Sequence, residues 1–177
     1  MNNKFIALLL AFSFVAATIN TSAAMYTTSK SKVVSIDPFD LINAGRINAT
    51  YERKISAKNS FCINGSFWSF DEFRTAFGIG GAYRWYFDLF EEGKSSMNGL
   101  SVAPRLDLYY WSESWNNHLL KDESYPTLAL GAEVNYKWVF SDKWVIEPTI
   151  KLVFPVLKKS GHRYTNHGFG INLGYAF

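Results

Sequence analysis

The chain has 177 residues and a formal net charge of +3, and 18% of its residues are Phe, Trp or Tyr. A chain of this length forms one domain with one core, and so small a charge gives no reason to expect a nucleic-acid-binding protein. Cys62 is the single cysteine, which excludes an internal disulfide and favours a small buried side chain over a reactive thiol.

The N-terminal segment has the pattern of a secretory signal peptide. Lys4 precedes an apolar run over residues 5–17, which is shorter than the ~20 residues that a transmembrane helix needs. Ser22 and Ala24 fit the two small positions of an A-x-A-like cleavage site. We expect residues 1–24 to be removed and residues 25–177 to form a single exported domain. An uncleaved membrane anchor is the alternative.

The remaining chain alternates between bulky apolar residues and small or polar residues. Because successive side chains of a strand point to opposite faces, this period of two predicts β-strands. The expected strands cover about 32–38, 45–55, 60–70, 77–87, 100–110, 128–138, 144–154 and 169–177. The clearest is the last, whose bulky face is formed by Phe169, Ile171, Leu173, Tyr175 and Phe177.

The expected connections alternate in length. Short turns are expected at 56–59 and 141–143 and a medium one at 91–98, whereas the opposite end has loops at 39–44, 71–73, 112–124 and 157–167. Most expected strands are longer than the ~5–6 residues usual in soluble proteins and suit a tilted strand that crosses a membrane. We therefore predict an all-β, eight-stranded, antiparallel up-and-down transmembrane β-barrel, with the asymmetry of bacterial barrels.

A soluble lipocalin-like barrel alternates as well, with its apolar face inward. Here the non-bulky face is rich in Gly, Ala and Ser, which suit the narrow lumen of eight strands, and the bulky face would overfill that lumen. Bulky aromatic residues also gather near the expected periplasmic strand ends, as a membrane-interface girdle would. The predicted girdle consists of Tyr51, Trp85, Trp138, Trp144 and Tyr175.

The inward face carries four acidic and four basic residues. Buried charges must be paired, so we predict an ion-pair network that fills the lumen, with a gated polar path or proton relay as the alternative. The residues are Glu52, Arg84, Arg105, Asp107, Glu133, Lys137, Glu147 and Lys151.

The signal peptide, the alternating strands and the terminal GINLGYAF together resemble the small eight-stranded outer-membrane proteins, of the type of the OmpA transmembrane domain and OmpX. Segment 36–55 is also similar to the opening of a family of uncharacterised outer-membrane barrels, with Asp37-Pro38 where that family has an Asn-Pro-like turn. The resemblance implies a location in the bacterial outer membrane, and we expect a monomer. It also implies that the barrel-assembly machinery recognises the last strand, ending in Phe177.

A rim enzyme that modifies lipid A would need a nucleophile beside a base. His118, His162 and His167 all fall in expected loops, and none forms the His-x-Ser pair that the deacylases of this class share. We expect no catalytic site, no metal and no cofactor. The expected role is therefore non-enzymatic, in envelope integrity or surface interaction. A lipid A-modifying or other hydrolytic enzyme and a narrow pore are the alternatives.

Two expected outer loops are candidates for partner binding. Loop 112–124 contains Trp115 and could contact a surface or host ligand. In loop 157–167, basic side chains are expected to pair with lipopolysaccharide phosphates. They are Lys158, Lys159, His162 and Arg163.

Overall fold

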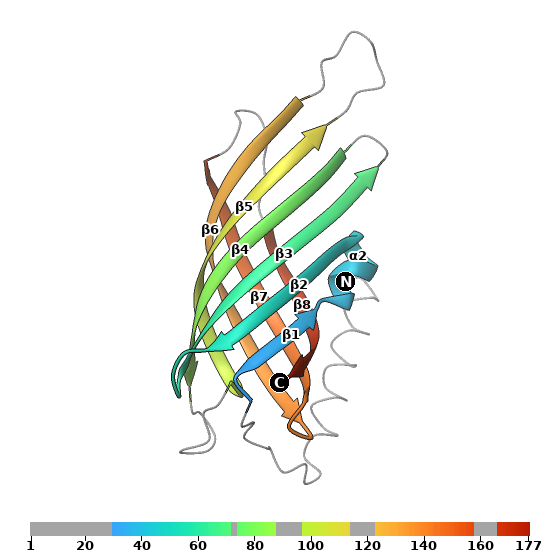
Figure 1. Cartoon of the computed structure of the whole chain (residues 1–177). Coiled ribbons are helices and arrows are strands. Elements are labelled where there is room, and N and C mark those ends of the chain that lie inside the picture. The colour runs from blue at the N-terminus through green and yellow to red at the C-terminus, as the bar shows by residue number, and fades with distance from the viewer. Residues whose placement is uncertain (1–29, 72–73, 88–96, 114–122, 158–165) are drawn as a thin grey trace, which may run out of the picture.

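The computed structural model describes residues 30–71, 74–87, 97–113, 123–157 and 166–177. Eight strands close into one barrel in which each strand pairs antiparallel with its neighbours in sequence and β1 pairs with β8 (Figure 1). The predicted eight-stranded up-and-down barrel is confirmed. The strands are β1 Lys32–Ile36, β2 Arg46–Lys54, β3 Asn59–Asp71, β4 Arg74–Phe87, β5 Gly99–Glu113, β6 Glu123–Phe140, β7 Trp144–Leu157 and β8 Asn166–Ala176.

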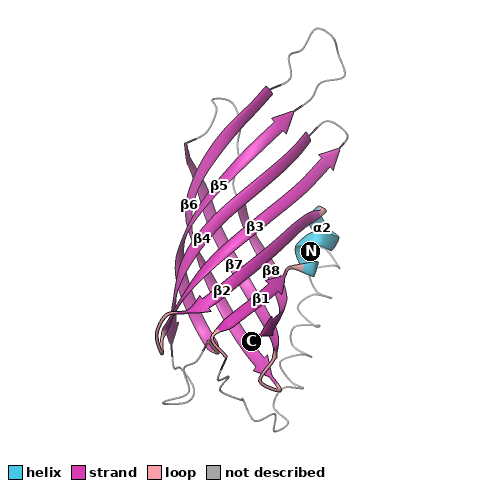
Figure 2. Ribbon diagram, in the orientation of Figure 1, coloured by secondary structure: helices cyan, strands magenta, loops and turns pink. Residues whose placement is uncertain are grey.

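The N-terminal segment of the barrel differs from the sequence prediction. The strand expected over 32–38 ends at Ile36, and the loop expected at 39–44 is the short helix α2, Pro38–Ala44 (Figure 2). Asp37 caps this helix, since its side chain accepts a hydrogen bond from the backbone N–H of Asp40, and Pro38 occupies a position where its missing N–H costs nothing. Within the described ranges, no helix is long and apolar enough to cross a bilayer.

Two predicted loops are shorter than expected, because strand pairing continues beyond the clear alternation. β5 and β6 stay in register up to the pair Glu113 and Glu123, so the connection between them has fewer residues than the loop expected at 112–124. β7 reaches Leu157 and β8 begins at Asn166. The connection between them is therefore also shorter than the loop expected at 157–167. The tall β3–β6 side of the wall is evident in Figure 1.

Tight turns join β2 to β3 and β6 to β7 at one end of the barrel, called the turn end below; the opposite end is called the loop end. Ser141 and Asp142 both have positive φ, 50° and 59°, the conformation of a two-residue hairpin turn whose twist matches that of the strands. Lys143 N–H closes the turn by donating to the carbonyl oxygen of Phe140 at 3.0 Å. The turn end is therefore tightly pinned.

The two faces of the wall differ in polarity. Glu52, Arg84, Asp107 and Glu133 point into the barrel and are buried. Large apolar side chains point outward and are exposed on every long strand. They include Phe61, Phe67, Phe77, Ile79, Leu106, Leu108, Leu130, Ile150, Leu152 and Phe154. The bulky face of the alternation is thus the outer surface.

Candidate functional site: the filled lumen

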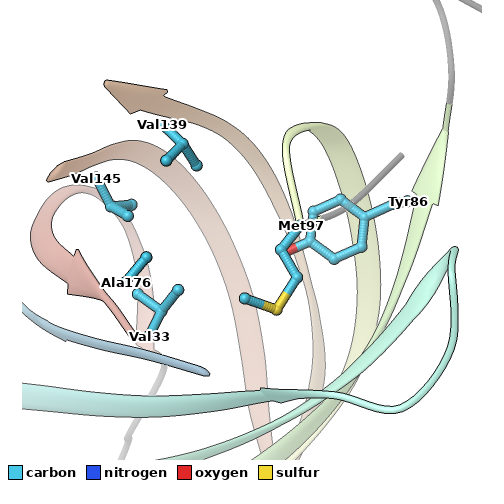
Figure 3. Close-up of a cluster of buried hydrophobic side chains, with 6 residues drawn as sticks. All are labelled: Val33, Tyr86, Met97, Val139, Val145 and Ala176. Carbon is cyan, nitrogen blue, oxygen red and sulfur yellow. The ribbon is translucent and has the colours of Figure 1, made fainter. Parts of the chain in front are cut away.

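An apolar cluster closes the lumen at the turn end. Figure 3 shows Met97 and Tyr86 across the lumen from a group of small aliphatic side chains. Met97 is 1% exposed and has a positive φ of 53°. The cluster consists of Val33, Tyr86, Met97, Val139, Val145 and Ala176.

Glu52 of β2 is the centre of the next layer. Its carboxylate accepts hydrogen bonds from Arg84 Nη1 at 2.8 Å, from the Tyr86 hydroxyl at 2.5 Å and from Ser60 Oγ at 2.5 Å. Lys137 Nζ also donates to it. Because both oxygens are occupied by donors from three other strands, Glu52 ties β2 to β3, β4 and β6 through the centre of the barrel.

Arg84 of β4 links this layer to the one above it. Its Nη1 lies 3.0 Å from Glu147 Oε2, and its Nη2 lies 2.9 Å from Glu133 Oε1. Lys137 Nζ also contacts Glu147 Oε2, at 3.0 Å. One guanidinium therefore bridges Glu52, Glu133 and Glu147, in the multidentate geometry that its planar fork of donors permits.

The network continues toward the loop end through Arg105 of β5. Arg105 Nη1 lies 2.8 Å from Glu133 Oε2, and its Nε lies 2.6 Å from Asp107 Oδ2. Asn64 donates a long 3.5 Å hydrogen bond to Asp107 Oδ1. The ion pairs thus form one chain along the lumen, from Lys137 at the turn end to Asp107.

Seven of the eight predicted lumen charges are joined in this chain. Lys151 is the exception: it lies on the inward face and pairs in register with Glu133, but it makes no ion pair with any residue of the described ranges. It is within electrostatic reach of Glu133 and of Asp37. Lys151 supplies the fourth positive charge facing four carboxylates.

Glycines make room for these side chains. A Cβ atom at Gly80 would overlap the carboxylate of Asp107, and one at Gly78 would lie 2.6 Å from the Tyr109 ring. At Gly170 the space is occupied by the carboxylate of Asp37. The small residues of the inward face therefore receive the long side chains of neighbouring strands, which fill the lumen at these positions.

Aromatic side chains fill the loop end of the lumen. Trp68 of β3 packs edge-to-face on Tyr109, with ring centroids 5.5 Å apart, and on Trp111 at 5.3 Å. The Arg46 guanidinium lies 5.0 Å from the Trp68 ring centroid. None of these residues is among the predicted lumen residues, although Tyr109 falls on the same face of the alternation as Asp107.

Asp37 is a further buried charge, outside the eight predicted lumen charges. Its Oδ1 accepts a hydrogen bond from the backbone N–H of Ile171 at 3.3 Å, and the side chain is 2% exposed. From the sequence, the Asp37-Pro38 dipeptide predicts only a turn. Asn172 and Thr149 also belong to the inner surface, since Asn172 Nδ2 donates to Glu147 and to Thr149.

The five predicted girdle residues all lie on the outer face toward the turn end. Trp144 pairs in register with Tyr175, and their rings meet edge-to-face at 5.5 Å. Trp138 contacts Tyr136 at 4.7 Å. Trp85 pairs with Asn59 at the start of β3, and Tyr51 lies nearer the middle of its strand than the others.

The outward residues of β8 take part in closing the barrel. Phe177 N–H donates to the carbonyl oxygen of Lys32 at 2.9 Å, and Lys32 N–H donates to the carbonyl oxygen of Phe177 at 3.1 Å. Leu173 and Tyr175 are exposed on the outer surface, Ile171 is partly exposed, and Phe169 packs on Phe39 of α2. The same strand thus carries the predicted assembly pattern and the closing seam.

The predicted partner-binding positions Lys158, Lys159, His162 and Arg163 lie outside the described residues, as do His118 and Trp115. Within the described ranges, no group of three His, Cys, Asp or Glu side chains is arranged to hold a metal ion. What the described site does chemically is to neutralise buried charge and to hold eight strands together.

No protein-family model and no curated protein sequence matches the chain. The crystal structure of the N-terminal β-barrel domain of Pseudomonas aeruginosa OprF is similar to it, with a TM-score of 0.50 over 85% of this chain and 98% of that chain. The two sequences are 9% identical, so the similarity concerns the fold alone. This chain and the OprF domain share the closed eight-stranded barrel architecture.

Proposed function

We propose that this protein is an integral outer-membrane β-barrel with a closed lumen. It supports envelope integrity or surface interaction and is neither an enzyme nor an open pore. The observation that carries the proposal is the reversed polarity of the barrel: charged side chains are buried inside, whereas large apolar side chains cover the outside. A water-exposed surface of this kind would aggregate, whereas in a bilayer it is the lowest-energy arrangement.

The height of the apolar surface supports membrane insertion. On β4, the outward residues from Phe77 to Phe87 include Ile79 and Trp85, and these four are exposed. Ten residues separate Phe77 from Phe87, which at ~3.3 Å per residue and a tilt of ~40° is about 25 Å along the barrel axis. This equals the height of the apolar band of outer-membrane barrels. The girdle at the turn end then lies at the periplasmic interface.

The lumen supports a role other than transport. An ion pair buried on all sides resists loss of either partner, and here the chain from Lys137 to Asp107 lies between the Met97 cluster and the Trp68 cluster. Eight strands leave space only for side chains. A narrow pore would require all three layers to rearrange.

The segments that join β5 to β6 and β7 to β8 are the proposed sites of contact with partners at the cell surface. Trp115 is suited to a protein or host ligand, and Lys158, Lys159, His162 and Arg163 are suited to lipopolysaccharide phosphates. Export through residues 1–24 and recognition of Phe177 by the barrel-assembly machinery complete the proposal.

Membrane fractionation of the expressed protein tests the proposal. The protein is expected in the outer-membrane fraction, resistant to carbonate extraction, and its gel mobility is expected to change on boiling, as it does for a stable barrel. Recovery of a folded protein in the soluble periplasmic fraction would overturn membrane insertion. Altered lipid A masses on overexpression would overturn the non-enzymatic role.

The surface role has its own test. Replacing 114–122 by a Gly-Ser segment of equal length is expected to leave heat-modifiable mobility unchanged and to abolish adhesion to host or bacterial surfaces. The matched control replaces the turn-end segment 91–96, which would face the periplasm. An equal loss of adhesion in both variants would contradict a surface role for this loop.

A further inference from the structure

The barrel wall is interrupted between β2 and β8. β1 pairs with β8 only from Val33 to Ile36, opposite 173–176, although β8 continues to Asn166. On the other side, β1 pairs with β2 only as far as Ala49, although β2 continues to Arg46. Figure 1 shows α2 at this position, well below the loop end of β3–β6.

Helix α2 is bonded to both edges of the interruption. Asp37 N–H donates to the carbonyl oxygen of Asn48 on β2 at 3.1 Å, and Asp37 Oδ1 accepts from Ile171 N–H on β8 at 3.3 Å. Asp40 pairs with Arg46 Nε at 3.1 Å. Phe39 packs edge-to-face on Phe169, with centroids 5.5 Å apart. One backbone hydrogen bond and several side-chain contacts therefore take the place of the missing strand ladder.

The interruption lies at membrane depth. Phe169 stands six residues from the girdle residue Tyr175 on the same face of β8, which is about 15 Å along the barrel axis at ~3.3 Å per residue and ~40° tilt. The apolar band is ~25 Å tall. The contact between Phe39 and Phe169 thus falls inside the band rather than at the outer rim.

The exposed face of α2 suits hydrocarbon. Ile42 is 83% exposed and Leu41 is 47% exposed. Two polar groups of the helix have partners within it: Asn43 Nδ2 donates to the Phe39 carbonyl oxygen at 2.7 Å, and Gly45 N–H donates to the Leu41 carbonyl oxygen at 3.0 Å. Irregular backbone at membrane depth requires such internal partners.

We propose that the outer face of α2, formed by Leu41 and Ile42, is a lipid-contacting part of the barrel wall that binds the acyl chains of the bilayer and closes the lateral gap between β2 and β8. This inference rests on the proposed membrane location. It differs from the ordinary expectation that the segment joining the first two strands is a water-facing outer loop.

Nitroxide labelling in reconstituted phospholipid vesicles tests the proposal. In a Cys62→Ser background, Ile42→Cys is compared with Leu106→Cys in the apolar belt and Ala57→Cys in the turn. The quantity measured is the ratio of the label's accessibility to oxygen to its accessibility to a water-soluble nickel chelate. This ratio is expected to be high at position 42, within about twofold of the ratio at 106, and low at position 57. Heat-modifiable mobility confirms that each variant is folded.

The controls separate the two proposals. A water-accessible label at 42 beside a lipid-exposed label at 106 would overturn the inference and leave the membrane barrel intact. A water-accessible label at 106 would overturn the membrane location itself. Asp37→Ala, which removes the cap and the bond to Ile171, is expected to increase the motion of the label at 42. An unchanged spectrum there would contradict the closure by α2.

Discussion

Glu52 shows how single residues hold this barrel together. It accepts hydrogen bonds from Ser60, Arg84, Tyr86 and Lys137, so its charge is compensated by two cations although the side chain is 2% exposed. A buried carboxylate without such partners would cost several kcal/mol. The stability of the lumen therefore depends on the partners of Glu52.

Substitution of Glu52 tests this dependence. Glu52→Gln keeps the shape of the side chain and removes its charge, which leaves Arg84 and Lys137 with excess positive charge. We expect the free energy of unfolding to fall by about 3–5 kcal/mol, measured by urea titration of tryptophan fluorescence in lipid vesicles. The control Ser60→Ala loses one hydrogen bond to Glu52 and is expected to lose about 1 kcal/mol. Equal losses in both variants would contradict a central role for the charge.

Close backbone approach is a second requirement at this scale. A Cβ atom at Gly131 would overlap the carbonyl oxygen of Leu152 and lie 2.7 Å from the Cα of Val153. Gly131→Ala must therefore push β6 away from β7, and we expect a loss of about 1–3 kcal/mol in the same titration. Gly65→Ala is the matched control, because nothing lies within 4 Å of its added Cβ. If the control loses as much stability, close packing at Gly131 is not the cause.

At the scale of the element, each strand has one apolar and one polar surface. On β5, Leu106 and Leu108 face outward, whereas Arg105 and Asp107 are buried in the ion-pair chain. A shift of register by one residue would exchange these faces. This alternation fixes the register of the wall.

A depth series on β5 tests the lipid-facing surface. Leu106 lies near the middle of the apolar band, whereas Val102 pairs with the girdle residue Trp85. Leu106→Arg is expected to cost about 2–4 kcal/mol, and Val102→Arg only about 0–1 kcal/mol, because an arginine near the interface reaches the headgroups. Urea titration in vesicles measures both. Equal costs at the two depths would contradict the assigned membrane position.

Prediction of the elements succeeded where one period ran without interruption. In β7 and β8 the alternation over 144–154 and 169–177 covers most of each observed strand. The predicted strands are too short at Trp111 and Tyr125, which pair in register beyond the alternating stretch. The strand predicted over 32–38 is too long, because Asp37 caps a helix that begins at Pro38.

At the scale of the whole molecule, the lumen is closed in layers. The Met97 cluster, the ion-pair chain and the Trp68 cluster follow one another along the axis. Each layer joins strands that are far apart in sequence, such as Arg84 on β4 with Glu147 on β7. The filling of the lumen is therefore a part of the core and contributes to stability.

Electrical recording tests this closure. The purified barrel is expected to show no discrete conductance steps in a planar bilayer, since the three layers leave no continuous water path. A general porin in the same chamber serves as the positive control, and heat-modifiable mobility shows that the recorded sample is folded. Regular steps that persist in a folded sample would favour the narrow pore.

The sequence alone determined the barrel and the number of strands, because a period of two assigns side chains to two faces without reference to the rest of the chain. The small residues of one face and the bulky residues of the other then indicated which face points inward. The sequence also placed eight compensating charges on one face. Only the tertiary structure decided which charges meet, since Glu52 and Lys137 are 85 residues apart and their contact depends on closure of the barrel. For the same reason, only the structure showed that Lys151 stands apart from the ion pairs and that α2 fills a gap in the wall.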